Sequence, residues 1–162
     1  GTSSWKDVFR DVRSFPSFHE PSGGKVHSGF LSSYEEQREK IPTFTSPPIV
    51  AGHSLGAAIA LLYASERKVE GIYLFACPKT GTDSFVRKVE EGGRVWRIQN
   101  RRDLVTKIPL GLSHAGEEIR LDFDAGSVVG NHILPNYISV LQKAHRRDGG
   151  GETNRLRRRS NV

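Results

Sequence analysis

Apolar residues gather in short continuous runs, and these runs alternate with longer segments of helical spacing. The runs at 49–51, 71–77 and 94–98 predict strands, because each is short and is bounded by glycine, proline or charged residues. Between the first two lies LGAAIALLYASER (55–67), which is apolar on nearly every face and therefore predicts a buried helix. A further helix is predicted at 83–91, and the alternating pattern within 118–123 predicts a strand at a sheet edge.

Three amphipathic helices are predicted outside this alternating region, over 5–12, from about residue 30 to before Pro42, and over 131–144. Segment 14–25 holds two prolines and two glycines and predicts a surface loop. Strand–helix alternation with continuous apolar strands is typical of a parallel sheet that helices cover on both faces. The predicted fold class is therefore α/β, with a mainly parallel sheet flanked by helices.

Charge is distributed unevenly over the 162 residues. The chain carries 24 Lys and Arg against 18 Asp and Glu, a formal charge of +6. From Lys143 onward there are seven basic residues and two acidic ones, so the remainder of the chain is close to neutral. We therefore expect one domain at 1–144 and a basic, disordered tail at 145–162. The basic tail is either a contact for anionic lipid surfaces or a solubilising or targeting extension, and we expect no nucleic-acid partner.

The pentapeptide GHSLG at 52–56 follows a predicted strand and opens a predicted helix. This is the context of the G-x-S-x-G elbow, in which a tight turn lifts the serine hydroxyl clear of the backbone. Because the turn is tight, we expect no room for a side chain at position 52 or position 56, where the two glycines stand. The pattern makes Ser54 a candidate nucleophile, and the Leu55 amide at the helix N-terminus a candidate donor to an oxyanion.

A nucleophilic serine needs a base that is itself oriented by an acid. In folds that carry this serine elbow, the chain order is Ser, acid, His. His132, at the start of the final helix, is the favoured base, with His114 as the rival and His145 in the basic tail. Asp103, directly after the third strand, is the favoured acid. The other carboxylates that we weighed are Asp83, Asp122 and Asp124. No metal or organic cofactor is expected, because this chemistry needs none, and the single Cys77 excludes a cysteine-built zinc site.

Six segments in order resemble the class 3 lipases, the fungal-lipase-like branch of the α/β-hydrolases. They are GTSSWKDVFRDV, VHSGF, AGHSLGAAIALLYA, FACPKTGTDSF, RIQNRRDLVTKIP and NHILPNYISVL. The resemblance runs from residue 1 to about residue 141. It implies Ser54 as nucleophile, Asp103 as acid and His132 as base, which agrees with the residues chosen above. It also implies that Thr2 closes the oxyanion hole and that His53 is an elbow residue rather than the base.

The chain departs from that family in two ways that matter for its fold and substrate. The family has strands before the segment that matches Gly1 and Thr2, and we expect the fold of this chain to lack them. The interval in which the family carries its lid, 13–26, is short. We expect a serine carboxylic-ester hydrolase that acts on acylglycerol-like lipid through an acyl-enzyme on Ser54. The alternatives are an esterase for small or aryl esters, and a non-catalytic lipase-like module that binds lipid or a partner.

Overall fold

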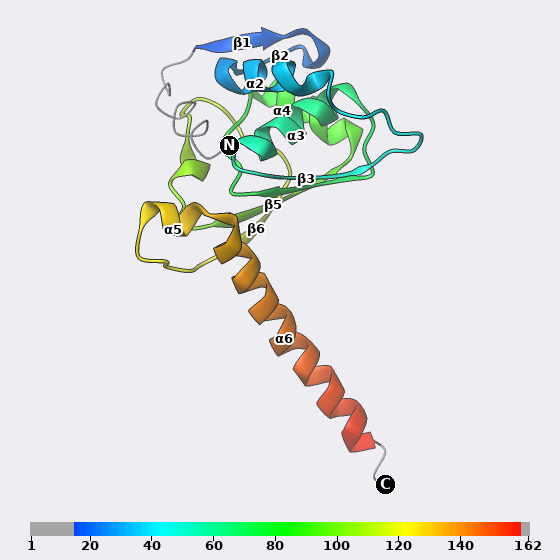
Figure 1. The fold of residues 1–162 in the computed structure, drawn as a ribbon, viewed down its shortest axis with the longest axis vertical. Helices are drawn as coiled ribbons and strands as arrows, with labels where there is room; N and C mark the ends of the chain where they lie inside the picture. The colour runs from blue at the N-terminus through cyan, green and yellow to red at the C-terminus, as the bar shows by residue number, and fades with distance from the viewer. Residues whose placement is uncertain (1–14, 160–162) are drawn as a thin grey trace.

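The core of the molecule is a four-stranded parallel sheet. The structure, a computed structural model, describes residues 15–159, with side chains up to residue 147. The strands lie in chain order, and every neighbouring pair is parallel. They are β3 (Ile49–His53), β4 (Gly71–Phe75), β5 (Arg94–Asn100) and β6 (Glu117–Leu121). The predicted α/β class is confirmed, and β6 is an edge strand as its alternating pattern predicted (Figure 1).

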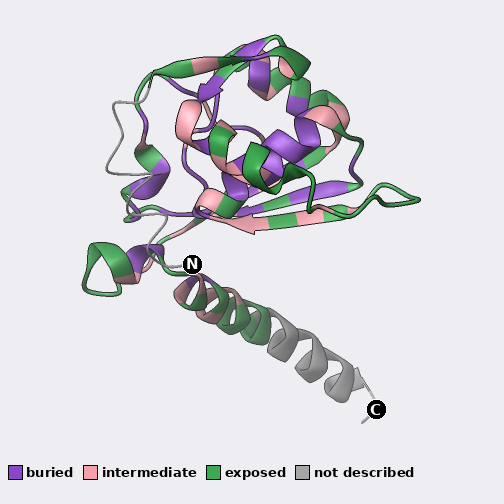
Figure 2. Ribbon diagram, turned by 45° about the horizontal axis from the view of Figure 1, so that its top comes forward, coloured by how far each residue is buried: buried purple, intermediate pink, exposed green. Residues whose placement is uncertain are grey.

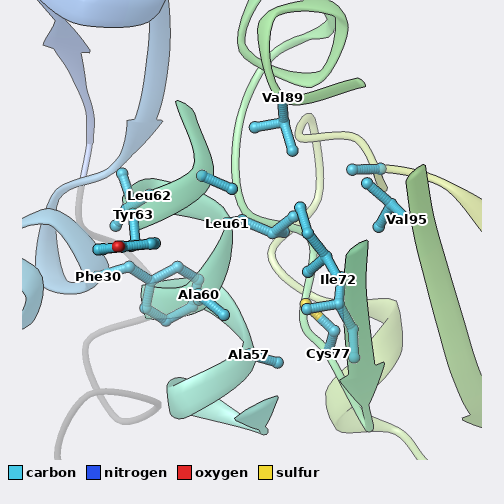
Figure 3. Packing of buried hydrophobic residues seen from close by; sticks show 14 of the residues in the cluster. Phe30, Ala57, Ala60, Leu61, Leu62, Tyr63, Ile72, Cys77, Val89 and Val95 are labelled. Carbon is cyan, nitrogen blue, oxygen red and sulfur yellow. The ribbon is translucent and has the colours of Figure 1, made fainter. Parts of the chain in front are cut away.

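Helices cover both faces of the sheet. On one face α3 and α4 connect successive strands, and α2 packs over α3 (Figure 1). These helices are α2 (Ser28–Arg38), α3 (Leu55–Glu66) and α4 (Asp83–Gly92). Because β3, β4, α2 and α4 all contact α3, its apolar residues are buried on most sides, as the sequence predicted. Figure 3 shows Phe30 of α2, Leu61 of α3 and Ile72 of β4 within this cluster.

Residues 16–27 form an antiparallel hairpin where the sequence predicted a surface loop. Strands β1 (Pro16–His19) and β2 (Gly24–His27) are joined by the short 3₁₀ helix η1 (Glu20–Ser22). The prediction was wrong because four-residue strands carry little pattern, and tertiary contacts hold this hairpin. Lys25 exchanges two hydrogen bonds with Thr82 at the start of α4, one through the Thr82 hydroxyl and one between backbones.

The chain ends in two helices where one was predicted. The short α5 (Val128–His132) is separated from α6 (Leu134–Arg159) by Ile133, whose backbone is extended. On the second face of the sheet, Tyr137 of α6 packs with Ile98 of β5. Figure 2 shows α6 leaving the body of the molecule. Over residues 15–159, none of the helices has both the length and the apolar character needed to cross a bilayer.

α6 continues past residue 144, where we expected the domain to end. After Pro135 the sequence contains no proline, and its six arginines favour helix, while each of the three glycines at 149–151 opposes it by about 1 kcal/mol. The division into a domain of 1–144 and a basic tail of 145–162 stays a prediction.

Candidate active site

Ser54 lies at a sharp turn between β3 and α3. Its φ of 55° and ψ of −122° fall in a region that is costly for a residue with a side chain. The Ser54 amide donates to the carbonyl oxygen of Phe75 in β4 at 2.9 Å, and the Ser54 carbonyl accepts from the amides of Ala57 and Ala58. Bonds on both sides of the turn therefore hold the strained backbone.

The two glycines of the elbow have different roles. A Cβ added to Gly52 would lie 2.3 Å from the carbonyl oxygen of Gly56 and 2.7 Å from Cα of Ala57, so only glycine fits there. A Cβ added to Gly56 would meet no described atom within 4 Å. The expectation that neither position has room for a side chain is therefore right for Gly52 and wrong for Gly56, because the space beside Gly56 is open.

Three side chains from separate segments form one hydrogen-bonded chain. Ser54 Oγ lies 2.8 Å from His132 Nε2, and His132 Nδ1 lies 2.8 Å from Asp103 Oδ2. Their exposed fractions are 5%, 4% and 0% respectively. Because an ionised carboxylate only accepts hydrogen bonds, Nδ1 of His132 carries the proton that it shares with Asp103. Nε2 is then left to accept the proton of the Ser54 hydroxyl, which is the arrangement that activates a serine.

Asp103 is held by donors on both of its oxygens. The Val105 amide donates to Oδ1 at 3.0 Å, and the Tyr137 hydroxyl donates to Oδ2 at 2.8 Å. Tyr137 in turn accepts from the amide of Asn100, the last residue of β5. Burial raises the pKa of Tyr137, so its hydroxyl stays protonated and remains a donor. Local sequence pattern could not predict this contact, because Tyr137 lies 34 positions from Asp103 and reaches its carboxylate only through the packing of α6.

The rival residues lie in other environments. Nε2 of His114 donates to the carbonyl oxygen of Thr106 at 2.8 Å, and burial, with Arg97 nearby, lowers the pKa of His114 to about 4. His145 is exposed on α6. The other carboxylates make contacts at the surface, Asp83 with Ser113 and the remaining two with arginines. Those two are Asp122 and Asp124.

Of the two candidate oxyanion donors, the structure describes Leu55 and not Thr2. Leu55 is the first residue of α3, and the first amides of a helix have no partner within it, so the Leu55 amide remains a candidate donor to a developing negative charge. Thr2 and the predicted helix over 5–12 lie outside the described residues. Within the described part of the chain, no group of three or more His, Cys, Asp or Glu side chains is arranged to hold a metal ion.

Comparisons with known proteins point to one family. The family described as lipase (class 3) matches residues 1–112. The chain is 38% identical over 141 residues to a lipase of Rhizomucor miehei, covering 73% of this chain and 39% of that protein. It is 32% identical over 120 residues to secreted mono- and diacylglycerol lipase 1 of Fusarium solani, covering 62% and 35%. The crystal structure of lipase II from Rhizopus niveus superposes with a TM-score of 0.60 at 31% identity, covering 78% of this chain and 55% of that one.

The chain belongs to the class 3 lipase family, and its fold is that of the α/β-hydrolase-like fungal lipases. It spans about two-fifths of the length of the curated relatives described above.

Proposed function

We propose that this protein hydrolyses carboxylic esters of lipids, acylglycerols among them, through an acyl-enzyme on Ser54. The observation that carries the proposal is the continuous hydrogen-bonded chain from Ser54 through His132 to Asp103. Membership of a lipase family, and the mono- and diacylglycerol substrates in the name of the Fusarium solani relative, support lipid esters as the substrate class.

Ser54, His132 and Asp103 have different roles in this reaction. His132 takes the Ser54 proton as Oγ attacks the ester carbonyl, and it returns the proton to the departing alcohol. Asp103 stabilises the imidazolium that forms in between. The Leu55 amide, at the N-terminus of α3, donates to the oxyanion of the tetrahedral intermediate. Water then attacks the acyl-enzyme by the same route, and the fatty acid leaves.

Apolar side chains next to the candidate triad support a lipid substrate. Leu104 directly follows Asp103 and is 52% exposed, and Ile133 directly follows His132 and is 38% exposed. Exposed apolar groups beside a buried polar site favour a ligand that is itself largely apolar.

Labelling with an active-site phosphonate tests the nucleophile. Wild-type protein should take up one label per chain and hydrolyse esters, and Ser54→Ala should lose both. The expected loss of kcat is about 10³-fold or more, because only binding and the oxyanion donor would remain. His132→Ala should lose a similar factor, whereas the matched variant His114→Gln should keep the wild-type kcat. Labelling that survives in Ser54→Ala would overturn the proposal.

A second candidate is an esterase for small soluble esters. It is favoured by the hairpin of β1 and β2, which occupies the interval expected to carry a lid and is bonded to Thr82 instead of lying free. Comparing an emulsified long-chain triacylglycerol with a soluble short-chain ester separates the two candidates. A lipase should turn over the emulsion faster than the soluble ester, and an esterase should prefer the soluble one.

A further inference from the structure

We propose that His53 is a positioning residue for the candidate base: its ring N–H holds the backbone of His132 in place against Ser54. This inference rests on the proposed function, since it assigns to His53 a part in the same reaction. His53 stands next to Ser54 at the end of β3, and its Nε2 lies 2.8 Å from the carbonyl oxygen of His132.

The direction of this hydrogen bond follows from its acceptor. A carbonyl oxygen can only accept, so Nε2 of His53 carries the proton and donates it. The rings of His53 and His132 lie side by side, with centroids 5.0 Å apart and an interplanar angle of 41°. The residue before the nucleophile is thus bonded to the residue that supplies the base, across 79 positions of sequence.

The bonded carbonyl lies at the C-terminal end of a short helix. His132 is the last residue of the five-residue helix α5, and Ile133 after it is extended. The last carbonyls of a helix need partners from outside it, and His53 supplies one. The side-chain amide of Asn100 donates to the preceding carbonyl, that of Asn131, at 3.2 Å. Asn100 ends β5, the strand that leads to the candidate acid Asp103. The His53 bond connects the base directly to the strand that carries the nucleophile.

His53 is also suited to this place by its charge. Burial lowers the pKa of His53, and the neighbouring His132 lowers it further, although the Asp103 carboxylate and the bond to the His132 carbonyl oppose this. A neutral His53 can donate its hydrogen bond without repelling the imidazolium that His132 becomes during the reaction. An arginine or lysine would supply a donor at the cost of a second positive charge beside the base.

Two substitutions separate positioning from packing. His53→Gln keeps an N–H donor at similar reach, and His53→Leu keeps the volume and loses the donor. His53 also makes an edge contact with the Tyr137 ring, at 6.5 Å between centroids, which a leucine can replace in part. If positioning is the role, His53→Leu should lower kcat on a soluble ester by about 10²-fold with little change in KM, because small displacements of a base are costly. His53→Gln should recover most of that loss.

The measurements are kcat and KM for a soluble short-chain ester, normalised to the sites that the phosphonate titrates, together with Tm. An unchanged kcat in His53→Leu would overturn the positioning role, as would equal losses in folded His53→Gln and His53→Leu. A second readout needs no turnover: the downfield proton resonance of Nδ1–H between His132 and Asp103. It should weaken or broaden in His53→Leu and persist in His53→Gln, and equal resonances in both would also overturn the inference. If wild-type protein shows this resonance but neither labelling nor turnover, the proposed function fails. The resonance in the two variants then still tests whether the His53 hydrogen bond holds His132 against Asp103.

Discussion

The ring nitrogens of His114 and His132 have different hydrogen-bond partners. These partners make His132 the candidate base and give His114 a structural contact. His132 lies between an ionisable carboxylate and a hydroxyl, so a proton can be taken up and passed on. His114 donates to a backbone carbonyl beside Arg97 and Lys79, in a position where a charged ring is disfavoured. The same residue type is therefore suited to proton transfer in one place and to a fixed neutral contact in the other.

The low pKa of His114 predicts a specific loss of stability in acid. Burial, the larger cause, and then Arg97 bring that pKa from 6.5 to about 4 in the folded protein. Between these values the unfolded chain binds the proton more readily than the folded one, so stability is complete above about pH 6.5 and falls as the pH drops toward 4. Urea unfolding at pH 7 and pH 4.5 should show a smaller acid-induced loss in His114→Gln than in wild type.

The exposed His145 supplies the control for this measurement. His145→Gln should lose as much stability on acidification as wild type does. Equal losses in wild type and His114→Gln would contradict the assignment of this pH dependence to His114.

Sequence pattern and chain order were sufficient to choose the three residues that meet at the candidate site. They were insufficient to find the residues whose hydrogen bonds keep those three in place. Ser54 is marked by its pentapeptide, and Asp103 and His132 by their places after a strand and before a helix. His53 and Tyr137 act through hydrogen bonds that span 79 and 34 positions. Such contacts depend on how the helices pack against the sheet, and local pattern carries no information about that packing.

At the scale of the elements, the turn from β3 to α3 has one position at which a side chain is excluded. Gly52→Ala would push a methyl group against backbone atoms of Gly56 and Ala57, which cannot rotate away. We expect Gly52→Ala to lower the free energy of unfolding by about 1–3 kcal/mol. It should also reduce ester hydrolysis, because the backbone that must move to make room includes the turn that carries Ser54.

Gly56→Ala is the matched control for this substitution. Its added methyl group meets no described atom, and alanine favours helix over glycine, so stability should stay level or rise by about 0.5–1 kcal/mol. Chemical denaturation of the two variants beside wild type measures both effects. Equal destabilisation by the two alanines would contradict the close approach at Gly52.

The regular elements were predictable to the extent that each carries its own periodicity. The strands at β3, β4 and β5 and the helix α3 are marked by uninterrupted apolar residues, and the structure has them where the pattern indicated. The hairpin of β1 and β2 was missed, because its burial comes from contacts with α3, α4 and the segment before α4. The break at Ile133 was missed because the apolar spacing over 133–141 fits one continuous helix face, although Pro135 is a residue that favours the start of a new helix.

At the scale of the whole molecule, most of the excess positive charge and the candidate active site lie in different parts of the chain. Ser54, Asp103 and His132 meet at the carboxyl ends of the strands, whereas the basic residues from Lys143 onward follow the part of α6 that packs on the sheet (Figure 1). Leu141 is the last described residue of α6 that packs against the cluster around Tyr137. Among the described side chains, those of 142–147 therefore lie outside this cluster.

We predict that the basic tail draws the protein to anionic membranes. Each basic residue near such a surface contributes about 1 kcal/mol, reduced by salt. Deleting residues 146–162 should leave turnover of a soluble short-chain ester unchanged and weaken binding to vesicles that contain an anionic phospholipid. A full-length variant with Arg155, Arg157, Arg158 and Arg159 replaced by glutamine should lose binding in the same way, which attributes the loss to charge instead of length. Co-sedimentation at low and high salt, with neutral vesicles as the control, measures this binding. If full-length and truncated protein sediment equally with anionic vesicles, the tail has no membrane role and the solubilising interpretation holds.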